Sequence, residues 1–185
     1  MQHLIVPLDS DHVRAVAALA AEVAEVAGLP DLHAPVRPHV TVVAFTGLSR
    51  AAARQAIEGA LAGVDPFEIR AHGYGVFARS GRFGPSLNVP VVRSGSLDAV
   101  HGLAHRVLVE AGAAIAGWTA PETWSPHITL TDRALDSAGV GAAVAVLTER
   151  HHPSWHIPVD RLVVVGGWSE AVDGGEAIRL RAPRA

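Results

Sequence analysis

The 185-residue sequence contains no cysteine and no lysine. The absence of cysteine excludes a disulfide framework, a thiolate zinc site and a cysteine nucleophile. All 15 basic residues are arginines, which keep their charge and offer a planar fork to phosphate groups. The net charge of −3 argues against an extended, sequence-independent nucleic-acid surface, because such binding depends on many cationic side chains.

Long hydrophobic runs are also missing. The Ala-rich stretches are interrupted by Glu, His or Gly well before a membrane-spanning length. The first nine residues lack a basic region and hold only a short apolar run with Pro7, unlike a signal peptide. We therefore expect a cytoplasmic protein without a membrane partner. Since 49% of the residues are hydrophobic, the chain can bury a full core, and we expect one domain over residues 1–185.

One short phrase occurs twice. Pro38-His39-Val40-Thr41-Val42 returns as Pro126-His127-Ile128-Thr129-Leu130, 88 positions later (127 minus 39). Both phrases lie in runs rich in β-branched residues with Pro before the His, which predicts strands entered from a loop. Side chains i and i+2 share one face of a strand, so each phrase places an imidazole beside a hydroxyl. If the strands are neighbours, His39, Thr41, His127 and Thr129 converge on one cleft, an arrangement that suits acid–base chemistry on a phosphate ester.

The remaining pattern predicts alternating strands and helices. Strands are expected over residues 3–8, 39–46, 67–77, 86–92, 127–132, 157–168 and 177–181. Helices are expected from residues 9–11 to Gly28, from Ser49 to about Gly63, from Ser96 to Gly112, and over residues 137–150. Gly73 and Gly75, inside the third strand, indicate a bulge or a close backbone approach.

The order of elements repeats along the chain. Val6-Pro7 recurs as Val89-Pro90, and Ala27-Gly28 recurs as Ala111-Gly112. These recurrences indicate a duplicated strand-helix-strand-helix-strand unit, with halves of approximately 1–85 and 86–185. Two such halves place the His-Thr phrases around a pseudo-two-fold axis. We expect a monomer, because the internal repeat already provides the two-fold site.

The paired His-x-Thr-x phrases, each preceded by Pro and separated by nearly half the chain, resemble the motifs of the 2H phosphoesterase superfamily. That superfamily includes bacterial 2′-5′ RNA ligases and 2′,3′-cyclic phosphodiesterases. The resemblance implies an α+β, bilobal fold of two pseudo-symmetric lobes, each with an antiparallel sheet and outer helices, around a central cleft. It also implies that His39 and His127 are the acid–base pair, that Thr41 and Thr129 donate hydrogen bonds to phosphoryl oxygens, and that neither metal nor cofactor is needed.

Further residues are candidates for binding the substrate. Arg37 and Arg133 fall on the faces of their motifs by alternation and could strengthen phosphate binding, unless each is a solvated strand end. The aromatic candidates for stacking on a nucleobase are Phe83, Trp124, Tyr74 and Trp168. Core packing is the alternative for each of them.

Other histidines suggest other sites. His101 and His105 have the i, i+4 spacing of two metal ligands on a helix, but no Glu follows His101, and we expect this face to be solvated. His72 faces either the cleft or the solvent. We expect His151, His152 and His156 on the surface, in a loop beside Pro153.

The sequence thus predicts a phosphodiesterase that opens 2′,3′-cyclic phosphates, on RNA ends or on small cyclic nucleotides. Two imidazoles near neutral pKa supply both the base that activates water and the acid that protonates the leaving oxygen. The alternatives are 2′-5′ RNA ligation at RNA ends, a binding module that senses cyclic phosphates without turnover, and a metal-dependent His-rich enzyme.

Overall fold

The computed structural model describes residues 1–30, 37–78, 85–131, 135–166 and 177–181. The helices are α1 (Ser10–Val26), α2 (Arg50–Leu61), α3 (Gly95–Glu110) and α4 (Ser137–Arg150), with a 3-10 turn, η2, at Gly117–Thr119. The strands are β1 (Gln2–Pro7), β2 (His39–Thr46), β3 (Phe67–His72), β4 (Gly75–Phe77), β5 (Ser86–Pro90), β6 (Ala114–Ile115), β7 (His127–Thr129), β8 (Ser154–Val159), β9 (Arg161–Val165) and β10 (Ala177–Arg179).

The two strands that carry the repeated phrase are neighbours in the middle of one sheet. The eight-stranded sheet has the order β10-β9-β1-β2-β7-β5-β4, with β6 on β2, while β3 and β8 form a separate pair. All of these strand pairs are antiparallel. The expected α+β class is confirmed, and the two His-Thr strands meet within a single sheet.

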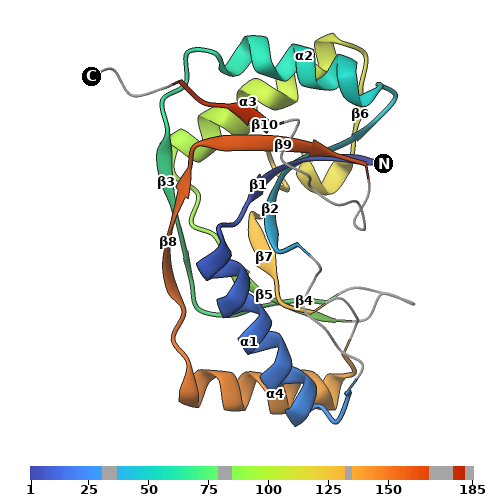
Figure 1. The fold of residues 1–185 in the computed structure, drawn as a ribbon. Helices are drawn as coiled ribbons and strands as arrows, with labels where there is room; N and C mark the ends of the chain where they lie inside the picture. Colours follow the sequence, from blue (N-terminus) through green and yellow to red (C-terminus); the bar gives the residue numbers. More distant parts are fainter. Residues whose placement is uncertain (31–36, 79–84, 132–134, 167–176, 182–185) are drawn as a thin grey trace.

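Each helix pair combines the two halves of the sequence. In Figure 1, α2 and α3 lie side by side at one end of the molecule, and α1 and α4 pair at the other end. Asp9 caps α1, because its side chain accepts from the backbone N–H groups of Asp11 and His12. On α1, buried Val16, Leu19, Ala20 and Val23 recur at the spacing of one helix face, which packs into the core.

The main sheet has a core face and a site face. Alternation sends Val40 of β2 and Ile128 of β7 into the hydrophobic core, where both are fully buried. Their neighbours His39, Thr41, His127 and Thr129 therefore lie on the opposite face. On β1, Ile5 and Pro7 pair with Thr41 and His39, so they belong to the same site face.

Two expected strands are each divided between the two sheets. The expected strand over residues 67–77 breaks at Gly73 and continues as β4 in the main sheet. The φ of Gly73 is +71°, a backbone conformation that glycine adopts without strain. In its described part, up to residue 166, the expected strand over residues 157–168 consists of the end of β8 and, after Asp160, β9 in the other sheet. A single apolar run cannot reveal such a change of sheet, because both parts alternate in the same way.

Several further elements differ from the expectation at their ends. Helix α3 is capped by Ser94, whose side chain accepts from the N–H of Leu97, and not by Ser96. Strand β7 ends at Thr129, three residues earlier than expected. The cap of α2 at Ser49 and the bounds of α4 are as predicted.

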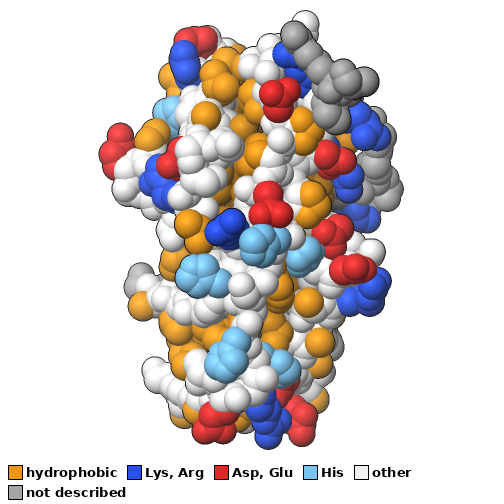
Figure 2. Space-filling model, turned by 90° about the vertical axis from the view of Figure 1, so that its left-hand side faces the viewer, with side chains coloured by type: hydrophobic (Ala, Val, Ile, Leu, Met, Phe, Trp, Pro, Cys, Tyr) orange, Lys and Arg blue, Asp and Glu red, His pale blue; other side chains and the backbone are white. Residues whose placement is uncertain are grey.

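The outer face of β3 and β8 is polar. Figure 2 views the molecule from this side and shows histidines gathered beside charged side chains. His72 is exposed, and His156 Nδ1 lies 2.7 Å from Glu68 Oε1. The prediction that His156 lies on the surface is confirmed, but it sits within β8 and not in a loop. Among the residues that the structure describes, no helix has the length and apolar character needed to cross a membrane.

Candidate functional site

The two repeated histidines are held in the same way. His39 Nδ1 lies 2.7 Å from the carbonyl oxygen of Arg37, and His127 Nδ1 lies 2.8 Å from the carbonyl oxygen of Ser125. A carbonyl oxygen only accepts, so Nδ1 carries the proton in both rings. In each neutral imidazole, Nε2 is therefore the nitrogen that can take a proton.

The strand register fixes how the four residues of the two phrases lie. Val40 pairs with Ile128 in the antiparallel ladder, which places His39 across from Thr129 and Thr41 across from His127. The two imidazoles thus occupy one diagonal and the two hydroxyls the other. Diagonal neighbours on a sheet lie about 7–8 Å apart. A phosphoryl group with a hydrogen bond on either side fits within such a span.

Burial keeps the histidines on the β2 side of the site neutral. Desolvation lowers the pKa of His39 below its ordinary value, and the hydrogen bond to Arg37 opposes this shift without cancelling it. His3 of β1 is 1% exposed, and its pKa is lowered from 6.5 to about 4 by burial first and then by the charges of His39 and the N-terminus. Both rings are therefore uncharged at neutral pH.

Trp124 supports the strand behind Thr41. Its Nε1–H donates to the carbonyl oxygen of Thr41 at 3.0 Å, and its ring stacks on His101 with centroids 4.0 Å apart and an interplanar angle of 8°. Trp124 is only 4% exposed. This burial corrects the expectation that Trp124 stacks on a nucleobase, because its ring is used in packing.

His101 belongs to the core and not to a solvated helix face. It is 2% exposed, and its Nε2 lies 3.0 Å from the carbonyl oxygen of Thr119. Thr119 Oγ1 in turn accepts from the backbone N–H of Ala44 on β2 at 3.1 Å. The expectation that His101 faces solvent is wrong. The helical spacing indicates burial of His101, because it follows buried Leu97 by four residues and so lies on the same helix face.

Two residues from β4 and β5 complete the other side of the site. Phe77 packs edge-on against His127, with ring centroids 4.5 Å apart. Asn88 pairs with Thr129 across the ladder, is 3% exposed, and its Nδ2 has no hydrogen-bond partner among the described residues. A Cβ at Gly75 would lie 2.6 Å from Asn88 Oδ1, so the predicted close backbone approach at Gly75 is confirmed.

The other aromatic candidates have different positions. Phe83 and Trp168 lie outside the described residues, as does Arg133. Tyr74 packs against the core, and burial raises its pKa to about 12. Trp118 was not singled out from the sequence, yet it is 43% exposed with its ring 6.2 Å from that of His3. An exposed ring beside the site face is the feature that a nucleobase needs for stacking.

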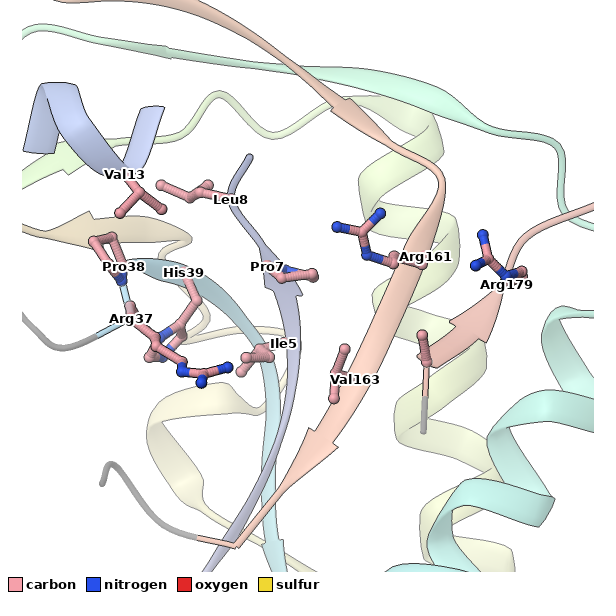
Figure 3. A pocket seen from close by; sticks show the side chains of 11 residues that line it. Ile5, Pro7, Leu8, Val13, Arg37, Pro38, His39, Arg161, Val163 and Arg179 are labelled. Atoms are coloured by element: carbon pink, nitrogen blue, oxygen red, sulfur yellow. The ribbon is translucent and has the colours of Figure 1, made fainter. Parts of the chain in front are cut away.

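A pocket of about 380 Å³ opens beside His39 (Figure 3). Arg37, a predicted binding residue, lines it together with Arg161 and Arg179, which the sequence reasoning missed. These two arginines stand on β9 and β10, far from either phrase in the sequence, so alternation around the motifs could not find them. Within the described part of the chain, no three His, Asp or Glu side chains form a group able to hold a metal ion.

Comparisons with known proteins concern the family and the fold of the chain. A family model described as the 2′-5′ RNA ligase superfamily matches residues 9–167. The chain is similar to the crystal structure of TT0787 from Thermus thermophilus, with a TM-score of 0.59 and 24% identity over 98% of this chain and 99% of that one. It is also similar to a crystal structure titled phosphoesterase, with a TM-score of 0.50 and 16% identity over 88% of this chain and 85% of that one. No curated protein sequence matches the chain.

Proposed function

The chain belongs to the 2′-5′ RNA ligase superfamily, as the paired phrases predicted, and on this premise we propose that it hydrolyses 2′,3′-cyclic phosphates by acid–base catalysis between His39 and His127. The observation that carries the proposal is the matched pair of imidazoles. Both lie on one sheet face, on a diagonal, and both are fixed by an Nδ1–H bond to a carbonyl oxygen. Two rings held in this way present Nε2 to opposite sides of a group bound between them.

His39 suits the role of the base. Burial lowers its pKa, so that its Nε2 is unprotonated at neutral pH and can take a proton from water as the water attacks phosphorus. His127, protonated on both ring nitrogens in this role and on the other side of the phosphoryl group, then gives its Nε2 proton to the ribose oxygen as the bond from phosphorus to that oxygen breaks. The product is a phosphate monoester. A proton returns to His127 and leaves His39 before the next turnover.

Thr41 and Thr129 suit the stabilisation of charge. Their hydroxyls lie on the second diagonal, where they can donate to the non-bridging oxygens that gain charge during attack. Thr41 is 7% exposed, and the bond from Trp124 to its carbonyl fixes its backbone. Donors that are placed before the substrate arrives avoid a reorganisation cost during the reaction.

These roles predict a bell-shaped dependence of kcat/KM on pH. The rate rises as His39 loses its proton, at a pH below the ordinary histidine value of 6.5 because its pKa is lowered. It falls at higher pH as His127 loses the proton that it must donate. The two apparent pKa values belong to the coupled pair. A rate that increases steadily from pH 5 to pH 9 would contradict this assignment.

A second candidate is the joining of RNA ends with a 2′-5′ linkage. The description of the matching family favours it. In this reaction a 5′-hydroxyl replaces water as the attacking group, so the same four residues serve. Incubation of RNA ends bearing 2′,3′-cyclic phosphate and 5′-hydroxyl groups separates the two candidates, since ligation lengthens the RNA and hydrolysis leaves its length unchanged.

The test of the proposal is turnover of adenosine 2′,3′-cyclic phosphate in excess EDTA. We compare the wild type with His39→Ala and His127→Ala, and use His72→Ala on the exposed face of β3 as the control. Removal of one member of the acid–base pair should lower kcat by about 10²–10⁴-fold, and the control should keep wild-type activity. Turnover that survives both substitutions would refute the two-histidine mechanism.

A further inference from the structure

We propose that the pocket beside His39 binds a second phosphate of the substrate, distinct from the phosphoryl group that reacts between His39 and His127. This inference rests on the proposed function for the identity of the reacting group. The pocket itself is defined by β1, the start of α1, β9, β10 and the segment that enters β2. The inference requires a substrate that carries two phosphates.

The charged residues that line the pocket are all arginines. Its lining contains Arg37, Arg161 and Arg179 as well as His39, and none of its lining residues is Asp or Glu. Figure 3 shows the side chains of Arg37 and Arg161 extending toward the pocket from opposite walls. Guanidinium groups bind phosphate oxygens through paired, charge-assisted hydrogen bonds. Since His39 lines the same pocket, a ligand held there also reaches the reacting site.

Two of these arginines lie directly opposite each other in the sheet. Arg161 and Arg179 are direct cross-strand partners of β9 and β10, on the face that carries His39. Like charges that lie directly opposite in a sheet repel each other. Arg161 has an ion pair with the adjacent Asp160 at 3.3 Å, whereas Arg179 has no acidic partner within the described ranges. An anion between the two guanidinium groups would relieve this repulsion.

The size and the remaining lining fit a nucleotide. A volume of about 380 Å³ exceeds what a single phosphate fills. The floor is apolar and includes Ile5, Pro7 and Val163, which suits the sugar or base between two phosphates. The second phosphate has two possible sources: a 5′-phosphate on a mononucleotide, or the phosphodiester that joins the preceding nucleotide of an RNA end.

The experiment measures kcat/KM for three substrates that share the reacting group. These are adenosine 2′,3′-cyclic phosphate, the same compound with a 5′-phosphate, and the dinucleotide ApA ending in a 2′,3′-cyclic phosphate. The proteins are wild type, Arg161→Gln and Arg179→Gln, with Arg106→Gln on the exposed side of α3 as the matched control. The readout is the preference for each two-phosphate substrate over the plain cyclic nucleotide.

We expect the wild type to prefer at least one two-phosphate substrate by about tenfold or more in kcat/KM, since a charge-assisted hydrogen bond to the second phosphate is stronger than a neutral one. Each pocket substitution should reduce this preference by about tenfold, while the control keeps it. Preference for the 5′-phosphate alone identifies a mononucleotide, and preference for the dinucleotide alone identifies an RNA end. Equal rates with all three substrates, or a preference unaffected by both pocket substitutions, would overturn the inference.

The failure of the proposed function has a different signature. If no cyclic substrate is turned over, that function fails, and calorimetric titration of the wild type and Arg161→Gln then tests the pocket alone. Adenosine 2′,5′-bisphosphate should bind about tenfold or more tightly than adenosine 2′-monophosphate, and the substitution should remove the difference. Equal binding of both nucleotides to the wild type would refute the second phosphate site.

Discussion

The buried His3 should make the folded protein sensitive to mild acid. Its side chain is 1% exposed, and its pKa is lowered from 6.5 to about 4, chiefly by burial. Between these two values the unfolded chain binds a proton that the folded chain does not. The contribution of His3 to stability is therefore complete above pH 6.5 and is lost as the pH falls toward 4.

The pKa difference sets the size of the effect. One pKa unit corresponds to about 1.4 kcal/mol, so the full difference of His3 amounts to about 3 kcal/mol, and screening of the part due to neighbouring charges reduces it to about 2–3 kcal/mol. His39 and His101 also have lowered pKa values, so they act in the same direction. The total loss of unfolding free energy between pH 7 and pH 4 should thus exceed the loss that His3 alone causes.

Urea denaturation at a series of pH values measures this loss. His3→Gln removes the titrating group, so its free energy of unfolding should fall by about 2–3 kcal/mol less than that of the wild type over the same range. His72→Ala, at an exposed position, should follow the wild-type curve. Parallel curves for His3→Gln and the wild type would refute the reasoning.

Two further predictions concern the support of the site. Trp124→Phe removes the hydrogen bond to the carbonyl of Thr41, so it should cost about 1–3 kcal/mol of stability in urea denaturation and lower kcat more than it raises KM; an unchanged kcat would contradict the positioning role. Gly75→Ala forces a methyl group against Asn88, which should cost about 1–3 kcal/mol by thermal denaturation. Gly102→Ala in α3, where nothing lies within 4 Å, is its control and should be neutral or stabilising; equal stability of the two variants would refute the close approach.

The sequence could predict the parts of the site that short-range periodicity controls. Alternation in a strand requires His39 and Thr41 to share a face, and the repetition of the phrase implied that the two strands meet. Pro before each His and Ser49 before α2 marked element starts correctly. These features depend only on residues close together in the chain.

The missed parts depend on long-range packing. Arg161 and Arg179 reach the pocket because β9 pairs with β1 and β10 pairs with β9 as the edge strand of the sheet. The use of Trp124 in packing depends on His101, 23 residues away (124 minus 101), which stacks on its ring. The division of the expected third and sixth strands between two sheets likewise follows from pairings that no local pattern encodes.

The most direct test of the central claim is a double-mutant cycle of kcat on a 2′,3′-cyclic nucleotide with His39→Ala, His127→Ala and the double variant. If the two imidazoles act as one acid–base unit, each single substitution should remove most of the activity, and the double variant should be about as slow as the slower single variant. Losses that multiply would mean that the two histidines act independently, and activity retained in either single variant would place the chemistry elsewhere.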